Sequence, residues 1–295
     1  MIDFLRYRWL AYMVSFFIIG SFVVGALYRK VTYGYVFTYS VDFTGGTEVT
    51  LRFEQAVSGE SVVKALKEAG IQDATPRELS PNEVMVRMHT VEKDMRGLGA
   101  HIKDVVEKAI PNNPVTISKM DAVGASVGKE MAWHWIYAVI IGLLAILLYL
   151  WFSLRHISFA IGNIVATVHD LCIILAFVFW FNYEISMSVV TAILIVLGYS
   201  VNDTIVIFFR IRENLVKMKG QALDVIVNTS LNATLRRTLL TSFATLLVVT
   251  SLMIFGGEVL RSLSFALFVG IVFGTYSSIF VASPAMMLLQ KRHEA

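Results

Sequence analysis

The sequence has almost no cysteine and few charged residues. Of its 295 residues one is cysteine, Cys172, so no disulfide can form within the chain. Charged residues make up 16% of the chain and hydrophobic residues 56%, whereas a soluble globular protein carries about 25% and about 45–50%. These values disfavour a disulfide-built secreted domain and a one-domain soluble enzyme. The net charge of +3 is too small to indicate a nucleic-acid partner.

Sequence motifs of several enzyme classes are also missing. The chain contains no GxxxxGK[ST] phosphate loop, no HExxH and no CxxC. No nucleophile stands in a convincing relation to a base, and no second histidine lies near His169 to complete a metal site. We therefore expect no catalytic residue, no metal and no bound cofactor.

Charge is distributed very unevenly along the chain. Residues 30–131 hold 12 Lys+Arg and 14 Asp+Glu, more than half of all charges. A helix needs about 20 mainly apolar residues to cross a membrane. Six stretches qualify: 9–28, 132–152, 158–181, 187–209, 238–255 and 262–289. We predict a short N-terminus with a first span (1–29), a polar domain (30–131) and a five-span membrane domain (132–295), with 210–237 as a basic connection.

Lysine and arginine near the span ends predict the orientation. If the N-terminus is inside, the inner side collects Arg6, Arg8, Arg155, Arg210, Arg212, Lys217, Lys219, Arg236, Arg237, Lys291 and Arg292. The short outer loops offer Arg261, and Arg29 and Lys30 at the outer end of the first span are a local exception. We expect both termini in the cytoplasm and 30–131 outside. The first span is too long for a signal peptide and lacks a cleavage site, so we expect it to be retained.

The polar domain shows alternating strand and helix patterns. Strands are predicted at 47–53, 75–79, 83–89 and 115–123, and helices at 58–69 and 90–109, the second weakened by Gly97 and Gly99. The order βαββαβ is that of a ferredoxin-like α+β fold. The sequence thus predicts a polytopic α-helical membrane protein, one plus five spans, with a ferredoxin-like extracytoplasmic domain.

Polar residues inside the third span indicate function. Asn163, Thr167 and Asp170 are spaced i, i+4, i+7 and share one helical face. An ionisable residue in lipid costs about 2.5–3.5 kcal/mol on translocon scales and suggests a functional site. His169 is better interpreted as a hydrogen-bonded core histidine than as a member of a proton relay.

The fourth span carries Asn202, Asp203 and Thr204 in its cytoplasmic half. Arginine has a stem long enough to reach a carboxylate one or two turns deeper, so Arg237 at the start of the fifth span can pair with Asp203. Protonation of Asp203 would release this ion pair. A static structural pair, or an arginine that only follows the positive-inside rule, remains the alternative.

Three glycine or proline features predict local geometry. Gly270 and Gly274 form a GxxxG pair, which favours close helix packing, and Pro284 is expected to kink the last span. In the segment from Asp42 to Thr47, Gly45-Gly46 indicates a tight backbone position before the first strand.

Four stretches together resemble a known family. They are VDFTGGT (41–47), MDAVGASVGKEM (120–131), GYSVNDTIVIFFRIREN (198–214) and LNATLRRTLLTS (231–242). The chain resembles the SecF branch of the SecD/SecF protein-export family, which is related to the resistance-nodulation-division (RND) exporters. The match covers essentially the whole chain, including the order of one span, a domain and five spans.

The resemblance implies a function that composition cannot supply. It implies an auxiliary subunit in the bacterial inner membrane that uses the proton-motive force with SecD to promote polypeptide translocation. The implied partners are SecD, the SecYEG channel, the translocating preprotein and a further small membrane subunit. Asp203 and Arg237 are implied in proton coupling, and the outer-domain motif holds Asp42, Gly45 and Gly46. Phe209 replaces the acidic residue usual in the family.

Other polar residues are candidates for a proton path or a polar intramembrane cluster: Asp170, His169, Asn202, Thr204 and Asn163. Two other functions stay open. One is a half-size RND-type proton-coupled exporter, which would also need a partner half. The other is a non-transporting envelope scaffold or assembly factor, which has little need for a buried carboxylate.

Overall fold

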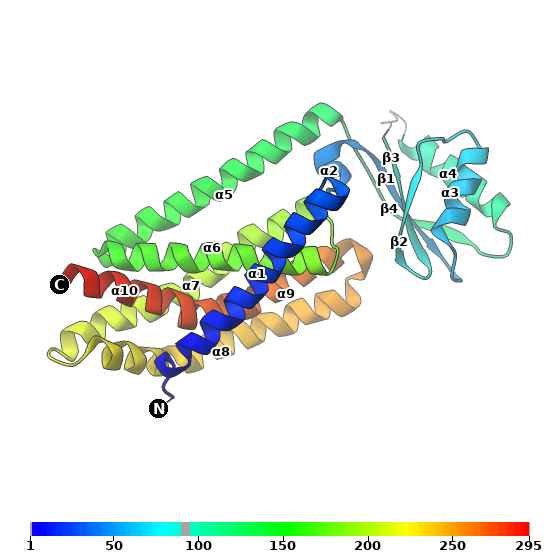
Figure 1. Cartoon of the computed structure of the whole chain (residues 1–295). Coiled ribbons are helices and arrows are strands. Elements are labelled where there is room, and N and C mark those ends of the chain that lie inside the picture. The colour runs from blue at the N-terminus through cyan, green and yellow to red at the C-terminus, as the bar shows by residue number, and fades with distance from the viewer. Residues whose placement is uncertain (1, 90–94, 295) are drawn as a thin grey trace. The chain divides into compact units, whose positions relative to one another are not determined.

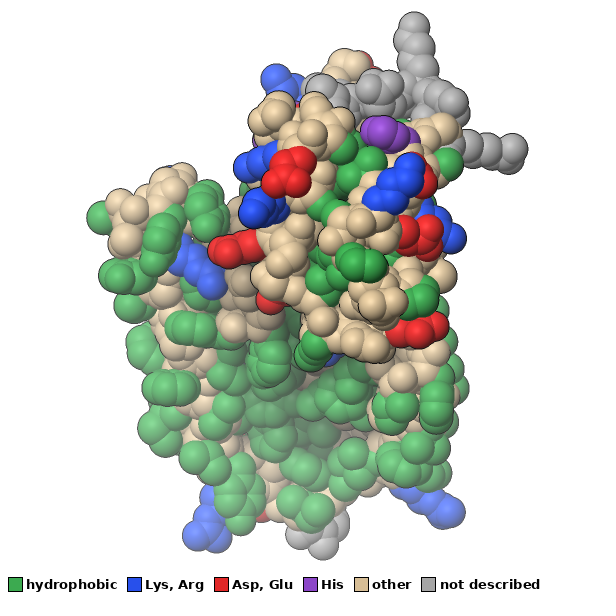
Figure 2. Space-filling view, turned by 90° about the vertical axis from the view of Figure 1, so that its right-hand side faces the viewer, with side chains coloured by type: hydrophobic (Ala, Val, Ile, Leu, Met, Phe, Trp, Pro, Cys, Tyr) green, Lys and Arg blue, Asp and Glu red, His purple; other side chains and the backbone are tan. Residues whose placement is uncertain are grey.

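The chain folds into two compact units, and the computed structural model describes residues 2–89 and 95–294 (Figure 1). One unit is helical and combines the residues up to 38 with those from 137 onward. The other comprises residues 39–136 and holds the sheet. Charged side chains of both signs lie on the sheet unit, whereas hydrophobic side chains cover the visible part of the helical unit (Figure 2).

Within the described residues, six helical stretches are long and apolar enough to cross a membrane, which confirms the six predicted spans. They are α1 (Arg8–Tyr33), α5 (Ala125–Leu154), α6 (Ile157–Trp180), α7 (Met187–Lys217), α8 (Leu223–Phe255), and α9 (Gly257–Ser277) continued by α10 (Ser283–Glu294). Most of the basic stretch predicted at 210–237 is helical, since α7 continues to Lys217 and only residues 218–222 interrupt the helices. Hydropathy marks the apolar part of a helix, whereas backbone hydrogen bonding extends it beyond the membrane.

The six spans differ strongly in burial. About 56% of the apolar window is buried in α6 and in α7, and 61% in the last span, against 11% in α1, 6% in α5 and 17% in α8. The centre of the helical unit is therefore built from α6, α7 and α9. The faces of α1, α5 and α8 are left for lipid or for other membrane proteins.

The last span changes its hydrogen-bond pattern near Pro284. A π-helical segment (Ser278–Ala282) separates α9 from α10, and the Ser283 hydroxyl donates to the carbonyl of Ser278 at 3.1 Å. Proline has no backbone N–H and cannot continue the ladder, so nearby side chains and altered turns pair the freed carbonyls. The predicted kink at Pro284 stays a prediction, and the structure shows a π segment just before it.

The described residues of the sheet unit form four antiparallel strands in the order β2-β3-β1-β4. The elements are β1 (Gly46–Phe53), α3 (Gly59–Glu68), β2 (Thr75–Ser80), β3 (Glu83–Met88), α4 (Met95–Ala109) and β4 (Val115–Val123). This is the predicted ferredoxin-like βαββαβ arrangement. The helix predicted from 90 is described from Met95, residues 90–94 lie outside the described part, and Gly97 and Gly99 do not interrupt it.

The core of the sheet unit lies between the sheet and its helices. Val49 and Leu51 of β1 pack with Val62 and Leu66 of α3 and with Ile102 of α4. Alternate residues of a strand face the same side, so the β1 pattern places these two side chains together.

A short helix and two glycines lead into β1. The helix α2 (Val41–Thr44) is capped by Ser40, whose hydroxyl accepts from the amide of Asp42. Gly45 has φ of 75° and Gly46 has φ of 115°, values that favour glycine. A Cβ on Gly46 would also collide with the carbonyl oxygen of Met88. The predicted tight backbone position is confirmed.

The geometry of Gly46 makes a direct prediction. Gly46→Ala should lower the apparent melting temperature of the purified protein in detergent and increase proteolysis within 39–136, because backbone strain of about 1–3 kcal/mol adds to the collision with Met88. Gly70→Ala is the matched control, since Gly70 also has positive φ but nothing lies within 4 Å of its Cβ position. Equal losses in both variants would contradict the steric part of this explanation.

Candidate functional site

Two glycines bring α9 against α7. A Cβ on Gly270 would collide with the side chain of Val196, and one on Gly274 would lie 3.0 Å from Cβ of Ser200. Small residues allow helix backbones to approach closely in lipid, where dispersion contacts and hydrogen bonds hold helices together. The predicted close-packing face is confirmed, and it presses Ser200 toward the interior of the bundle.

Asp170 lies in the middle of this interior, fully buried. Its Oδ2 accepts a hydrogen bond of 2.5 Å from the hydroxyl of Ser200 on α7. Its Oδ1 lies 3.2 Å from Nδ1 of the neighbouring His169, and Ser277 of α9 lies beside it. Three helices thus converge on one carboxyl group.

His169 extends the Asp170 cluster to α1. Its Nε2 lies 2.9 Å from the hydroxyl of Ser15, which lies 3.0 Å from the hydroxyl of Tyr276. The Tyr276 hydroxyl also donates to the carbonyl of Ala11 at 2.6 Å, and its ring stacks on His169. His169 is a hydrogen-bonded core histidine in this arrangement. Ser15 and Tyr276 were not predicted, because single hydroxyls in apolar helices carry no distinctive pattern.

Asp203 is the second buried carboxyl and lies at another point along α7. It is 3% exposed, and the hydroxyl of Ser242 on α8 donates to its Oδ2 at 3.4 Å. Ser242 also lies 2.6 Å from Oγ1 of Thr275 on α9, and the Tyr199 hydroxyl donates to it at 3.5 Å. Since Ser200 and Asp203 are three residues apart, the two carboxyl clusters meet α7 within about one helical turn.

The predicted ion pair between Asp203 and Arg237 is not formed in this conformation. No described cation lies within salt-bridge distance of Asp203, and Arg237 is exposed. Arg237 precedes Ser242 by five residues, about 7.5 Å along α8.

The other predicted polar residues divide into buried and exposed ones. Thr204 is buried and its hydroxyl donates to the Ser200 carbonyl at 3.2 Å. Asn163 is buried and its Nδ2 donates to Oγ1 of Thr167 at 3.5 Å, whereas its Oδ1 has no partner among the described residues. Asn202 is exposed and points about 100° away from Asp203 around the axis of α7. The structure therefore does not bring Asn202 into either cluster.

The outer-domain motif around Asp42 packs tightly against Gly128 at the start of α5, and this contact is called the corner below. Asp42 accepts a hydrogen bond of 2.8 Å from the hydroxyl of Ser40. A Cβ on Gly128 at the start of α5 would lie 2.9 Å from the carbonyl oxygen of Phe43. Residues 124–128 match the GxSxG pattern of a hydrolase nucleophile. Ser126 is exposed and donates to no described residue, so the glycine at 128 serves packing here.

A lysine beside this corner is surrounded by carboxylates. Lys119 forms an ion pair of 2.5 Å with Asp121. Burial lowers the pKa of Lys119, but the hydrogen bond to Asp121 and the charges of Asp121, Glu48 and Asp42 outweigh it, so the pKa lies above its usual value. Lys119 therefore stays charged at neutral pH.

Two family descriptions match the chain over these features. "SecD/SecF GG Motif" matches residues 34–57, which contain Asp42, Gly45 and Gly46. "Protein export membrane protein SecD/SecF, C-terminal" matches residues 101–292, which contain both buried carboxyls. The chain belongs to the SecD/SecF family. The resemblance in the four sequence stretches is thereby confirmed.

Curated relatives carry the name of the SecF branch. "Protein translocase subunit SecF" of Desulfurispirillum indicum is 37% identical, covering 99% of this chain and 93% of the relative. The subunit of the same name from Pseudomonas aeruginosa is 36% identical, covering 93% and 90%. With its six apolar helices, the chain is thus a multi-pass bacterial membrane protein of the SecF type.

Solved SecDF structures share the fold. The crystal structure of SecDF from Thermus thermophilus, a translocon-associated membrane protein, is 33% identical with a TM-score of 0.84. A SecDF structure in a super-membrane-facing form is 31% identical with a TM-score of 0.66. The match covers 98% of this chain but only 39% of each SecDF chain, so this chain corresponds to one part of a longer SecDF chain.

The α7–α9 contact of this SecF-type chain can be tested directly. Gly270→Leu should lower the apparent melting temperature in detergent, because overpacking against Val196 costs about 1–3 kcal/mol. Gly142→Leu on α5 is the control, since nothing lies within 4 Å of the Cβ position of Gly142. A Gly270 variant as stable as the Gly142 variant would show that close approach at Gly270 is not required.

Proposed function

We propose that this chain is the SecF subunit of a bacterial Sec translocase and acts with a SecD-type partner. It uses the proton-motive force to promote translocation of a polypeptide through the SecYEG channel. Both termini lie in the cytoplasm, and the domain of residues 30–131 lies on the outer side, where it can contact the emerging preprotein. A further small membrane subunit can join this complex.

The observation that carries this proposal is the environment of the two buried carboxyls. Asp170 and Asp203 lie among serine, threonine and tyrosine hydroxyls, and Asp170 also meets His169. A hydroxyl can donate to a carboxylate or accept from a carboxylic acid, so it accommodates both protonation states. A permanent contact with arginine or lysine would instead hold the carboxyl ionised. The surroundings therefore suit carboxyls that gain and lose a proton.

Arg237 supplies the proposed electrostatic response. In the described conformation Asp203 accepts a hydrogen bond from Ser242 and forms no ion pair with the exposed Arg237. We propose that this is the conformation of the protonated Asp203. Loss of the proton leaves a charge inside the membrane, and the long arginine stem allows Arg237 to approach it. As Asp203 loses and regains its proton, Arg237 moves toward it and away again, and this movement changes the packing of α7 against α8. We propose that this movement is transmitted to the outer domain.

The two alternative functions receive less support. A half-size exporter of small molecules is not favoured by relatives that are named protein translocase subunits. A passive scaffold has no use for two carboxyls that cost free energy to bury in lipid. Proton coupling gives both residues a role.

Asp203→Asn should abolish the gradient-dependent part of translocation, because the amide cannot release a proton. Reconstituted vesicles with the SecD-type partner and the channel would be measured with and without a proton gradient, at equal protein levels. Arg237→Ala should have the same effect, whereas Asp224→Asn in the first turn of α8 should leave translocation unchanged. Normal gradient-dependent secretion in both the Asp203 and Arg237 variants would refute proton coupling at this pair.

One face of α7 supports the proposed contact with a partner half. Ile195, Gly198, Asn202 and Phe209 are spaced i, i+3, i+7, i+14 on one face, and all four are exposed although α7 is among the most buried helices. An asparagine facing lipid is unfavourable, but in a helix interface it can hydrogen-bond. We propose that the SecD-type half packs here. Phe209 then serves packing in place of the acidic residue usual in the family.

A bulky residue on this face should prevent the partner from docking. Gly198→Phe should reduce co-purification of the SecD-type partner by about five-fold or more, as expected for the loss of about 1 kcal/mol of helix packing. Gly142→Phe on α5 is the matched control, because both glycines have open surroundings. If the two variants retained equal amounts of partner, the contact face would have to lie elsewhere on the helical unit.

A further inference from the structure

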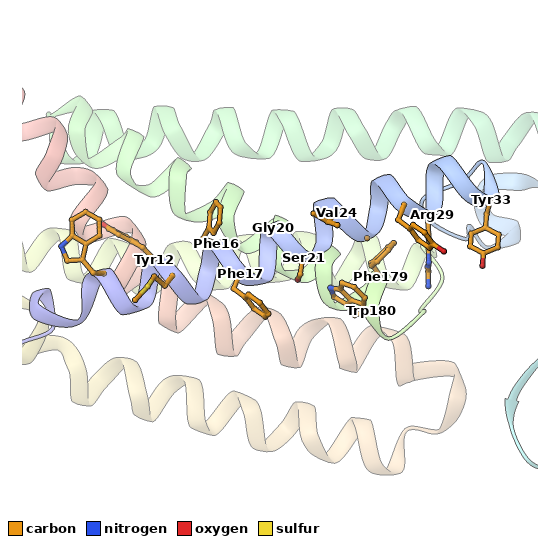
Figure 3. Close-up of a pocket in the computed structure, with 14 residues that line it drawn as sticks. Tyr12, Phe16, Phe17, Gly20, Ser21, Val24, Arg29, Tyr33, Phe179 and Trp180 are labelled. Carbon is orange, nitrogen blue, oxygen red and sulfur yellow. The ribbon is translucent and has the colours of Figure 1, made fainter.

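An open groove runs along α1 and ends against the C-terminal end of α6 (Figure 3). Its volume is about 1250 Å³, larger than the roughly 300–1,000 Å³ typical of small-molecule sites. The middle of the groove is formed by Gly20 and Ser21, and nothing lies within 4 Å of the Cβ position of Gly20. Small residues therefore leave a hollow in a surface otherwise rich in aromatic rings.

One end of this groove is cationic. Arg29 is the one charged side chain among the described residues that line it, and no described carboxylate pairs with it. Its guanidinium lies over the ring of Phe179 with Cζ 4.3 Å from the ring centroid (Figure 3). Such stacking leaves the N–H groups in the guanidinium plane free to bind two oxygens of a phosphate. Proton coupling and partner contact at α7 do not use Arg29.

The position of Arg29 is fixed by rigid neighbours. Phe179 is buried and packs edge-on against Phe22 and Trp180. One turn before Arg29, a Cβ on Gly25 would lie 2.8 Å from the Phe179 ring, so glycine allows the ring to lie against α1. The cation is therefore held at the membrane–water boundary beside Tyr28, Tyr33 and Trp180, the residue types that favour that level.

The distance along the groove from Arg29 to Gly20 fits the thickness of one leaflet of a bilayer. Arg29 and Gly20 are nine residues apart, about 13.5 Å along the helix. Half of the hydrocarbon core of a bilayer is about 15 Å. A phospholipid whose phosphate contacts Arg29 would thus lay an acyl chain along α1 as far as the hollow at Gly20. Arg29 is also an exception to the positive-inside rule, and a lipid site explains why a cation lies at this end of the span.

We propose that this groove binds an anionic phospholipid, with the headgroup phosphate on Arg29 and an acyl chain lying over Gly20 and Ser21. A zwitterionic lipid offers the same chains, but its own ammonium offsets the attraction. The charge of Arg29 therefore selects for a lipid with net negative charge. The site is independent of the proposed proton coupling, because it shares no residue with either carboxyl cluster.

Lipid retention tests the proposal. The protein, with its SecD-type partner, is reconstituted in nanodiscs of phosphatidylethanolamine and phosphatidylglycerol and extracted into mild detergent, and retained lipids are counted by native mass spectrometry. Phosphatidylglycerol should be retained in preference. Arg29→Gln should reduce its retention about five-fold, the effect of one basic residue at a membrane surface. Arg29→Lys should keep most of it.

Two further variants separate headgroup from chain binding. Lys30→Gln is the matched charge control, because Lys30 is exposed and does not line the groove, and it should retain lipid normally. Gly20→Leu should fill the hollow and reduce retention although Arg29 is intact. Equal retention in the Arg29→Gln and Lys30→Gln variants, or equal retention of the two lipids, would overturn the proposal. So would a photoreactive residue at position 17 that crosslinks to the partner polypeptide instead of to lipid.

Discussion

The close contact between α7 and α9 is the constraint on which the helical unit depends. Without side chains at Gly270 and Gly274, the two helices approach until Ser200 is pressed toward α6. Ser200 then donates to Asp170, and His169 carries the hydrogen-bonded cluster to Ser15 of α1. Since lipid offers no hydrogen-bonding partners, each of these polar groups has to be paired within the protein. Helix packing and the placement of the carboxyls therefore have one cause.

Much of this architecture could be predicted from the sequence because membrane thickness and side-chain periodicity are strong constraints. Apolar length revealed the spans, and alternation in residues such as those of β1 revealed the strands. Helix–helix pairing was harder, because the residues of one helix do not specify its neighbours. This is why Ser242 was missed as the partner of Asp203 and why Arg237 was placed in contact with it. Asn202 was grouped with Asp203 because adjacency in sequence was read as adjacency in space, although successive residues of a helix point about 100° apart.

The four sequence stretches that resemble the family pair up in space. The glycines after Asp42 lie in the same corner as Gly128, whose missing side chain admits the backbone of Phe43. In the helical unit, the stretch around Asp203 meets the stretch that ends at Ser242. In each pair the contact needs either a backbone without a side chain or a short hydroxyl. The four stretches are therefore characteristic of the family because their contacts require small residues and would be prevented by larger side chains.

The π-helical segment has a mechanical consequence for the last span. The one extra residue that a π segment accommodates rotates everything after it by about 100° relative to an uninterrupted α-helix. Before the segment, Ser277 faces Asp170 of α6, and after it, Met286 packs against Gly162 of the same helix. The extra residue is thus what keeps a single helix in register with α6 on both sides of Pro284. Removing one residue from Ser278–Ala282 would leave the first contact in place and turn the second away.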